Sequence, residues 1–329
     1  MTRTPRLTRR ATLALGAAGT ASLLMPQAAF AQIDRLAIHG PPAGPSITLA
    51  HAVATGQFAE IASEASFAAW RTPDELRAGL TSGDIRLSVV PVQAAANLYN
   101  RGFPIRLANV MTNGLLYIVA EDAGITEIDD LAGRHVAVPY RGDTPEIFFG
   151  QLLAHHGVGE SDLQITYAAS PTEAMQLMLA GRVDAALTTE PSTTAAVLRA
   201  KQVGRDIKRV ISIQKAWGEM MGAAPVLPQA GLAVTQPFLD ANADDLSALL
   251  GIVETATAAV LADPETAASN ASGALGMPAP LLAASIPSSN LVAHRASEAR
   301  EDIERMLTGM AGEDFARIGG ALPDDAFYL

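Results

Sequence analysis

The sequence predicts a two-lobed α/β fold in which each lobe is a mostly parallel sheet flanked by helices. Two observations lead to this prediction. Short apolar runs alternate with helical stretches from Arg35 to Pro191, and the whole series occurs twice at a nearly constant spacing. From Asp244 onward the chain is nearly all helical and has no sheet of its own, so this segment is expected to pack on lobe 1.

The composition is that of a globular protein with its own hydrophobic core. Of 329 residues, 49% are hydrophobic and 17% are charged, and this length suffices for two ordinary domains. The formal net charge of −11 argues against nucleic acid as a partner, because phosphate binding requires a basic surface. The chain has no cysteine, which excludes disulfides and also lipid attachment at a signal-peptide cysteine.

Residues 1–31 have the pattern of an export signal. Four arginines precede the apolar stretch ATLALGAAGTASLLM, and Ala29, Phe30 and Ala31 fit a small-residue cleavage site. We expect cleavage after Ala31 and a soluble periplasmic protein that is not a lipoprotein; an uncleaved anchor is the alternative. TRRATLAL resembles a twin-arginine signal, but Thr12 replaces a bulky apolar residue of that motif, so general secretion stays open.

The two copies of the repeat contain helix starts of the same kind. TPDELRAGLTSGDIRLSVVP from Thr72 and SPTEAMQLMLAGRVDAALTTEP from Ser170 each begin with a hydroxyl cap, a proline and, three residues after the cap, a glutamate. Each continues with a glycine, an apolar strand and a proline that permits another helix start. Upstream, the segments from Arg35 and Arg134 both run strand, glycine-containing loop, helix, glycine. This common order indicates an internal duplication.

The duplication places one α/β unit in each lobe. Lobe 1 is expected to begin with residues 32–112, lobe 2 to comprise residues 113–231, and residues 232–329 to return to lobe 1 and end in helices. The chain then crosses between the lobes twice, and we expect a hinge at these crossings, near Asn113–Tyr117 and Gly231–Thr235.

These segments resemble the substrate-binding proteins of ABC importers, in the nitrate/sulfonate/taurine group of the type II periplasmic-binding fold. The resemblance rests on GPPAGPS, TPDELRAGLTSGDIRLSVVP, LAGRHVAVPYRGDTPE, EAMQLMLAGRVDAALTTEP and the closing LPDDAFYL. It implies a small solute, an organic anion or an oxyanion, held between two closing lobes and delivered to an ABC-transporter permease. Membrane contact would occur only through that permease.

Four loops at predicted strand ends are candidates for the binding site. In open α/β sheets, ligands bind beyond the carboxyl ends of strands, where helix N-termini present free N–H groups. The first loop is GPPAGPS, with Pro42, Gly44 and Ser46; its glycine permits close approach of the backbone, and its serine offers a hydroxyl. In the second loop, Pro91 ends the strand and Gln93 opens the helix.

The third candidate loop, PYRGDTPE, contains Tyr140, Arg141 and Thr144. We expect Arg141 to clamp an anion through its forked guanidinium, because it is the only basic residue in the four loops. The alternative is that Arg141 is a solvated surface residue and that Thr144, like Ser46, only caps its helix.

The fourth candidate loop follows the short apolar run Val183–Leu187, which stops abruptly in Thr188, Thr189 and Glu190. If this strand ends at the floor of the cleft, one of these residues caps the next helix and its neighbours face the solute. Glu190 has the alternative role of a helix-start charge favoured by the helix dipole.

Trp217 is a candidate for an apolar wall of the pocket, because it stands beside Met220 and Met221. The alternative is that it fills the core of lobe 2. His155 and His156 are adjacent, so on a helix their side chains diverge and do not form a chelating pair. We expect neither a metal site nor a cofactor.

An enzyme on the same fold, resembling those of the menaquinone pathway and acting on a small carboxylate, is the competing interpretation, because fold does not decide function. The export signal argues against it, since those enzymes act on cytoplasmic metabolites. The chain also lacks cysteine and a GxSxG nucleophile elbow. We therefore expect a binding protein without catalytic activity.

Overall fold

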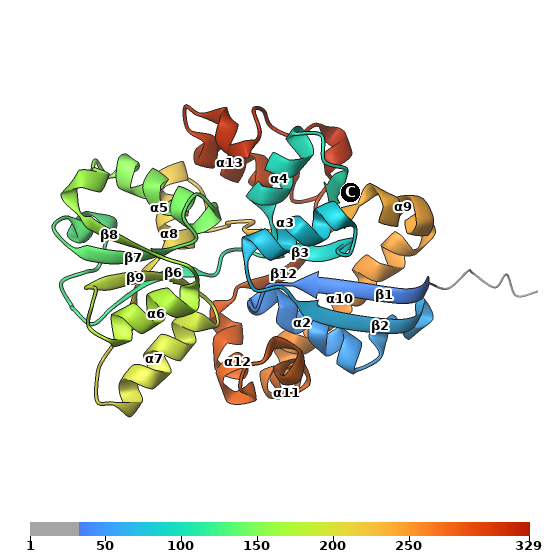
Figure 1. Ribbon diagram of the computed structural model, residues 1–329, viewed down its shortest axis with the longest axis horizontal. Helices are drawn as coiled ribbons and strands as arrows, with labels where there is room; N and C mark the ends of the chain where they lie inside the picture. The colour runs from blue at the N-terminus through green and yellow to red at the C-terminus, as the bar shows by residue number, and fades with distance from the viewer. Residues whose placement is uncertain (1–32) are drawn as a thin grey trace, which may run out of the picture. The chain divides into compact units, whose positions relative to one another are not determined.

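The computed structural model describes residues 33–329 and confirms the two-lobed α/β fold (Figure 1). The expected export signal and its cleavage after Ala31 lie outside the described residues. Strands and helices alternate along the chain, and the strands form one seven-stranded and one five-stranded sheet. We call the part built on the larger sheet lobe 1 and the part built on the smaller sheet lobe 2.

The sheet of lobe 1 contains strands from both ends of the described chain. Its strands are β1 (Ile33–Gly40), β2 (Ala62–Ala69), β3 (Leu87–Pro91), β4 (Ile105–Leu107), β5 (Asn109–Thr112), β11 (Ala230–Thr235) and β12 (Leu291–Arg295). They lie in the order β12-β5-β11-β3-β1-β2, and β4 also pairs with β11. Alternate residues face opposite sides, so that Leu87 and Val89 join one hydrophobic cluster and Val90 joins the other.

The sheet of lobe 2 comes from one continuous part of the chain. Its strands are β6 (Leu116–Ala120), β7 (His135–Pro139), β8 (Gln164–Ala168), β9 (Ala185–Thr189) and β10 (Lys208–Ser212). They lie in the order β10-β6-β9-β7-β8. Helices cover both faces of this sheet (Figure 1), so that all residues of β6 are buried.

The two copies of the repeat fold in the same way, which confirms the duplication. In both lobes the first strand of the copy lies between the third and the second, in parallel: β3-β1-β2 and β9-β7-β8. The repeat helices are α2 (Gly44–Ala54), α3 (Pro73–Ser82), α4 (Val92–Asn100), α5 (Thr144–His155), α6 (Pro171–Leu179) and α7 (Ser192–Gln202). As predicted, Thr72 caps α3 by accepting from the Glu75 amide at 3.2 Å, and Ser170 caps α6 by accepting from the Glu173 amide at 3.1 Å.

Both sheets are mixed, because parallel pairing among the strands is confined to those of the repeat. β6 runs antiparallel to β9, and β11 runs antiparallel to β3. Each of these strands follows a crossing between the lobes. It therefore enters its sheet from the interlobe side, at which the repeat strands end.

The two crossings comprise residues 113–115 and 222–229. The first lies inside the predicted hinge segment. The second lies upstream of the predicted Gly231–Thr235, because those residues pair within the sheet of lobe 1 as part of β11. In the first crossing Gly114 adopts φ of +107°, which side-chain-bearing residues rarely adopt, and the Asn290 amide donates to its carbonyl oxygen at 2.7 Å.

The remaining helices complete the core. They are α8 (Ile213–Met221), α9 (Gln236–Asn242), α10 (Leu246–Ala262), α11 (Pro264–Leu275), α12 (Ala279–Ser285) and α13 (Arg300–Ala311), with short 3₁₀ turns between elements. α10 packs against α2 and β12 in lobe 1, whereas α13 packs against α5 of lobe 2 and the turn at Phe315–Ile318. Within the described residues, 236–262 is the one helical run long and apolar enough to cross a membrane, but the buried Leu249, Leu250 and Val253 make it a core helix.

Gly231 in β11 should be intolerant of any side chain. A Cβ at this position would overlap the backbone carbonyl of Asn109, so the two chain segments would have to separate. Gly231→Ala should lower the free energy of unfolding, measured by urea denaturation, by about 1–3 kcal/mol. The matched control is Gly251→Ala in α10, where nothing lies within 4 Å of the new Cβ and helix propensity should add about 0.5–1 kcal/mol. Equal stability of the two variants would contradict the packing of β11 described here.

Candidate functional site

A cavity of about 1450 Å³ lies where the two lobes meet. It is lined by the starts of six helices, α2, α3 and α4 of lobe 1 and α5, α6 and α7 of lobe 2. Each of these helices follows a strand of the repeat, so the carboxyl ends of the six repeat strands meet at one place. This is the position at which α/β sheets bind ligands.

The helix starts give the cavity wall a partial positive charge. The capping residues of α2, α4 and α5 are Ala43, Pro91 and Asp143, and none of their side chains accepts a hydrogen bond from the first turn of its helix. The Val92 amide of α4 donates to the Gln229 carbonyl at 3.0 Å, but these first turns lack the full set of carbonyl partners that later turns have. Each such helix end favours an anion by about 0.3–1 kcal/mol, and by more where it is partly buried.

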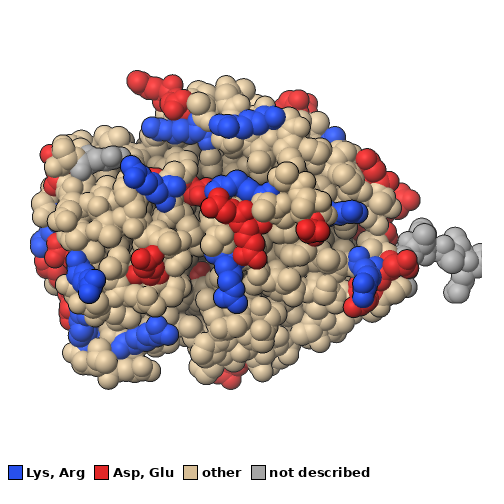
Figure 2. Space-filling model, in the orientation of Figure 1, with Lys and Arg blue, Asp and Glu red and all other residues tan. Residues whose placement is uncertain are grey.

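Charged side chains add to this positive potential. The charged residues of the lining are Arg71, Arg77, Arg101, Arg317, Asp143 and Glu146. Four arginines against two carboxylates make the lining positive, although the whole chain has a formal net charge of −11. On the face drawn in Figure 2, basic and acidic side chains gather near the middle, where the two halves of the molecule meet. The cavity thus opposes the sign of the protein as a whole.

The rest of the wall is largely apolar. Trp70, which follows β2, lines the cavity, and its Nε1 donates to Ser88 Oγ at 3.1 Å, so that its polar atom is satisfied inside lobe 1. Leu76, Leu98 and Leu153 line the cavity from α3, α4 and α5. Such a surface suits the carbon skeleton of an organic solute.

Two side-chain contacts join the lobes across the cavity. The Thr144 hydroxyl of lobe 2 donates to Gln93 Oε1 of lobe 1 at 3.2 Å, and both residues are buried. Arg77 Nη1 lies 3.3 Å from Asp143 Oδ1, and the Arg77 guanidinium also pairs with Asp74 at 2.9 Å. The start of α5 is therefore in contact with both α3 and α4.

Tyr140 holds an unusual backbone conformation at the edge of the cavity. Its φ of +57° lies in the left-handed region, which costs a residue with a side chain about 1 kcal/mol or more. Its amide donates to the Ala168 carbonyl at 3.0 Å, and its carbonyl accepts from the Asp143 amide at 3.0 Å. Burial raises the pKa of the Tyr140 phenol, so this hydroxyl stays neutral and can donate a hydrogen bond.

Half of the twelve predicted site residues line the cavity. These six are Pro42, Pro91, Gln93, Tyr140, Thr144 and Thr189. They come from all four predicted loops, so the structure brings the four loops together. The residues that it places elsewhere are Gly44, Ser46, Arg141, Thr188, Glu190 and Trp217.

Gly44 and Ser46 are buried behind the first loop. A Cβ on Gly44 would lie 2.6 Å from the side chain of Ser289, so the glycine permits packing against lobe 1 itself. The Ser46 hydroxyl is fully buried, contacts Gly40 and has no hydrogen-bond partner in the described part of the chain. It does not cap α2 either.

The structure places Arg141 where the alternative interpretation expected it, outside the cavity lining. Its guanidinium lies over the ring of Tyr167, 4.7 Å from the centroid, and outside the cavity lining. Its neighbours Tyr140 and Gly142, both with positive φ, do line the cavity. An arginine on an aromatic face at an exposed site contributes about 0.5–1 kcal/mol to stability.

Three polar residues end β9 and the loop after it. Thr188 and Glu190 make hydrogen bonds inside lobe 2, whereas Thr189 lines the cavity. Strand alternation turns Thr189 to the cavity and Thr188 and Glu190 away from it. Thr188 Oγ1 bonds Thr193 Oγ1 at 2.8 Å. Glu190 Oε2 accepts from the amide and the hydroxyl of Thr194 at 3.1 and 2.7 Å, and therefore caps α7.

Glu190 also forms a buried ion pair with the edge strand β10. Arg209 donates to Glu190 Oε1 from Nε at 2.8 Å and from Nη2, and Glu190 is fully buried. Burial raises the pKa of the Glu190 carboxyl, while Arg209 and Thr194 act in the opposite direction. The pair ties β9, β10 and α7 together.

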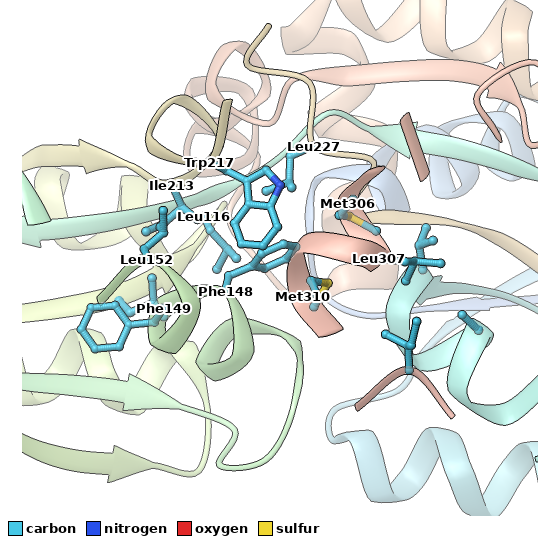
Figure 3. Packing of buried hydrophobic residues seen from close by; sticks show 14 of the residues in the cluster. Leu116, Phe148, Phe149, Leu152, Ile213, Trp217, Leu227, Met306, Leu307 and Met310 are labelled. Carbon is cyan, nitrogen blue, oxygen red and sulfur yellow. The ribbon is translucent and has the colours of Figure 1, made fainter. Parts of the chain in front are cut away.

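Trp217 belongs to the core and not to the cavity wall. Its ring meets that of Phe148 edge to face, with centroids 4.8 Å apart and planes at 85°. In Figure 3 the two rings lie beside Met306 and Met310 of α13. Trp217 is fully buried there, which leaves no surface for a solute.

Several residues of the lining were missed by the sequence-based prediction. Arg71 precedes the Thr72 cap of α3, and Thr172 follows the Ser170 cap of α6; both helix starts were recognised in the repeat but not assigned to the cleft. Applying the rule for strand ends to all six joints would have found them. Arg101 and Arg317 carry no such signal.

Among the described residues, no group of three or more His, Asp or Glu side chains is placed to hold a metal ion.

Comparison with known proteins gives one family and many structural neighbours. Residues 77–267 match the family model described as NMT1/THI5 like. No curated protein sequence matches the chain.

The structural neighbours share the fold at low sequence identity. An ABC transporter structure from Parabacteroides distasonis has a TM-score of 0.71 and 22% identity and covers 90% of this chain and 98% of its own. The periplasmic aliphatic sulphonate binding protein SsuA from Escherichia coli has a TM-score of 0.66 and 18% identity, with 82% and 91% covered. The periplasmic nitrate-binding protein NrtA from Synechocystis PCC 6803 has a TM-score of 0.59 and 15% identity, with 76% and 69% covered.

The position of Glu190 predicts a role in stability and not in binding. Glu190→Ala leaves Arg209 without its buried partner and should lower the free energy of unfolding by about 3–5 kcal/mol. Thr189→Ala, one residue earlier, should change it by less than about 1 kcal/mol, because no hydrogen bond of the Thr189 side chain lies within the described residues. Urea denaturation measures both. An unchanged stability of Glu190→Ala would contradict the ion pair.

Proposed function

This chain belongs to the NMT1/THI5-like family, and from that premise we propose that it is the solute-binding component of an ABC importer. It captures a small anionic solute in the cavity between the lobes and delivers it to a membrane permease. The solute-binding role agrees with the SsuA and NrtA structures that share its fold.

The observation that carries this proposal is the positive lining of the cavity in an acidic protein. Six helix starts and an excess of arginine over carboxylate converge there. A site of this kind attracts anions and repels cations. Arg71 is the residue best placed to bind the anionic group, because its side chain lines the cavity and has no carboxylate partner among the described residues.

Binding should favour the closed arrangement of the lobes. The pair Arg77–Asp143 is partly exposed, with 48% and 24% of the two side chains accessible, and such pairs contribute about 0–1 kcal/mol. The hydrogen bond between Gln93 and Thr144 adds about 0.5–1.5 kcal/mol. These contacts are too weak to hold two lobes together alone. A solute that touches both lobes supplies the rest, and the permease can then distinguish loaded from empty protein.

The proposed setting is the periplasm. The sequence pattern of residues 1–31 supports export, with processing after Ala31, and the related SsuA and NrtA structures are periplasmic proteins.

We propose residues 32–112 and 232–329 as lobe 1, and residues 113–231 as lobe 2, with binding residues contributed by both. We propose binding without catalysis.

Protein purified from its own periplasm should carry its solute, and native mass spectrometry should detect it as a mass lost on denaturation. With that solute in calorimetry, Arg71→Ala should weaken binding by about 10–150-fold, since a hydrogen bond to a charged group is worth about 1.5–3 kcal/mol.

The matched control is Arg141→Ala, which removes the same charge from a neighbouring surface outside the lining. It should leave the affinity within about twofold. A solute-free protein that binds no candidate anion would refute the proposed function. Loss of affinity in Arg141→Ala and not in Arg71→Ala would move the anion site to the outer surface.

A further inference from the structure

The helix α13 begins and ends in lobe 1 but buries apolar side chains in lobe 2. It follows β12 of the lobe 1 sheet and precedes the turn at Phe315–Ile318, which hydrogen bonds fasten to α4 of lobe 1. Its buried residues are Ile303, Met306, Leu307, Met310 and Ala311. Figure 3 shows Met306 and Met310 beside the rings of Trp217 and Phe148, which belong to α8 and α5 of lobe 2. One helix thus joins the lobes in addition to the two chain crossings.

The packing of α13 against lobe 2 is close. A Cβ on Gly309 would lie 2.7 Å from Cζ2 of the Trp217 indole and 3.0 Å from Sδ of Met221. The Gln151 amide of α5 donates to the Met310 carbonyl at 3.3 Å, so lobe 2 satisfies one of the carbonyl groups that the end of the helix leaves free. The missing side chain at Gly309 is therefore what lets the indole approach the helix.

This contact is stronger than the polar contacts between the lobes. Withdrawing α13 would expose Met306 and Met310 together with parts of two aromatic rings, and one aromatic side chain alone buries about 150–250 Å². By contrast, the ion pair of Arg77 with Asp143 is partly exposed, and the contact of Thr144 across the cavity is one neutral hydrogen bond. Because hydrophobic stabilisation grows with the area buried, the polar contacts should break first.

A second apolar contact between the lobes is smaller. Leu281 of α12 packs against the cluster that includes Ala195 and Ala196 of α7. Leu281 is only half-buried, whereas the methionines of α13 are fully buried. Of these two apolar contacts, the one made by α13 is therefore expected to survive separation of the lobes.

The α13 contact also lies beside the second chain crossing, residues 222–229. The last turn of α8 packs on this crossing, since a Cβ on Gly218 would lie 2.8 Å from the carbonyl oxygen of Ala224. Leu227 of the crossing belongs to the same hydrophobic cluster as Trp217, and both are labelled in Figure 3. Atoms close to a hinge are displaced least when domains rotate, so a contact at this place can persist while the lobes part.

We propose that α13 stays bound to lobe 2 when the lobes separate and serves as the pivot of closure. This inference rests on the closure that the proposed function requires. The lobes part at their polar contacts and the cavity opens, while Trp217 and Phe148 stay covered by α13. A helix that is bound in both states limits the directions in which the lobes can rotate. Closure then returns the start of α5 to α3 and α4.

Distances between pairs of spin labels test the pivot directly. The chain has no cysteine, so two introduced cysteines are its only ones. Lys215→Cys in α8 with Thr308→Cys in α13 reports the pivot, and Ala78→Cys in α3 with Gln176→Cys in α6 reports the opening. All four positions are exposed and outside the cavity lining. In protein shown by native mass spectrometry to be free of solute, the α3–α6 distance should exceed that in the structure by more than about 2 Å, and the α8–α13 distance should match it within about 1 Å.

Gly309→Ala tests the same inference through linkage. The added methyl group overpacks the contact with Trp217 and should lower the temperature of thermal unfolding by about 2–12 °C. If α13 is bound in both states, the methyl group destabilises both equally, and the ratio of open to closed protein in the α3–α6 distance distribution should stay within about twofold. If α13 left lobe 2 on opening, only the closed state would be destabilised, and this ratio would rise by about 5–150-fold.

The matched control is Gly273→Ala in α11, where nothing lies within 4 Å of the new Cβ. It should leave the ratio of open to closed protein unchanged and should not lower the unfolding temperature. An unchanged unfolding temperature of Gly309→Ala would contradict the close packing on which the pivot depends.

Three results would overturn the pivot. They are a lengthening of the α8–α13 distance as large as that of the α3–α6 distance, no lengthening of either distance in solute-free protein, and a raised open fraction in Gly309→Ala. The spin-label distances decide the matter even if Gly309→Ala fails to fold. The proposed function is judged separately by the solute that co-purifies. A protein that carries an anionic solute but gives any of these three results keeps its solute-binding role and loses the pivot.

Discussion

The first turn of an α-helix leaves amide N–H groups without carbonyl partners, and in this protein six such turns converge on one cavity. The convergence follows from the order of the chain, because a helix begins where each repeat strand ends and the strands of both lobes end at the same junction. Thr72, Ser170 and Glu190 cap three of these turns, and the uncapped turns of α2, α4 and α5 leave a partial positive charge that favours an anion. An acidic protein with a positive cavity between its lobes is the result.

The polar residues at the strand ends divide between this cavity and the interior. Strand alternation turns Thr189 to the cavity, whereas Thr188 and Glu190 fasten α7 and β10 to the sheet. The same division occurs in lobe 1, where Trp70 lines the cavity while its indole nitrogen bonds Ser88 inside. Each wall of the cavity is thus fixed by contacts within its own lobe.

The sequence predicted those features of the fold that depend on residues close together in the chain. The hydroxyl caps at Thr72 and Ser170 and the repeated order of strand and helix depend only on near neighbours, and they predicted both copies of the fold. The placement of the four loops at one site followed from the direction of the strands.

Side-chain direction and distant partners could not be predicted in this way. Glu190 is satisfied by Arg209 of another strand, Arg141 by the ring of Tyr167, and Trp217 by Phe148 and the C-terminal helix α13. Arg317 lines the cavity from a turn whose backbone is bonded to Gln93 and Asn97 of α4. Each of these contacts depends on tertiary packing, and a motif within a single loop carries no information about it.

The central claim is that one solute is held by both lobes and draws them together. Small-angle X-ray scattering of the protein, without solute and at saturation with the solute that co-purifies, tests it most directly. The radius of gyration should fall on binding, because contacts such as those of Thr144 with Gln93 and Asp143 with Arg77 form only when the lobes meet. An unchanged radius of gyration, with full occupancy confirmed by calorimetry, would contradict closure around the solute.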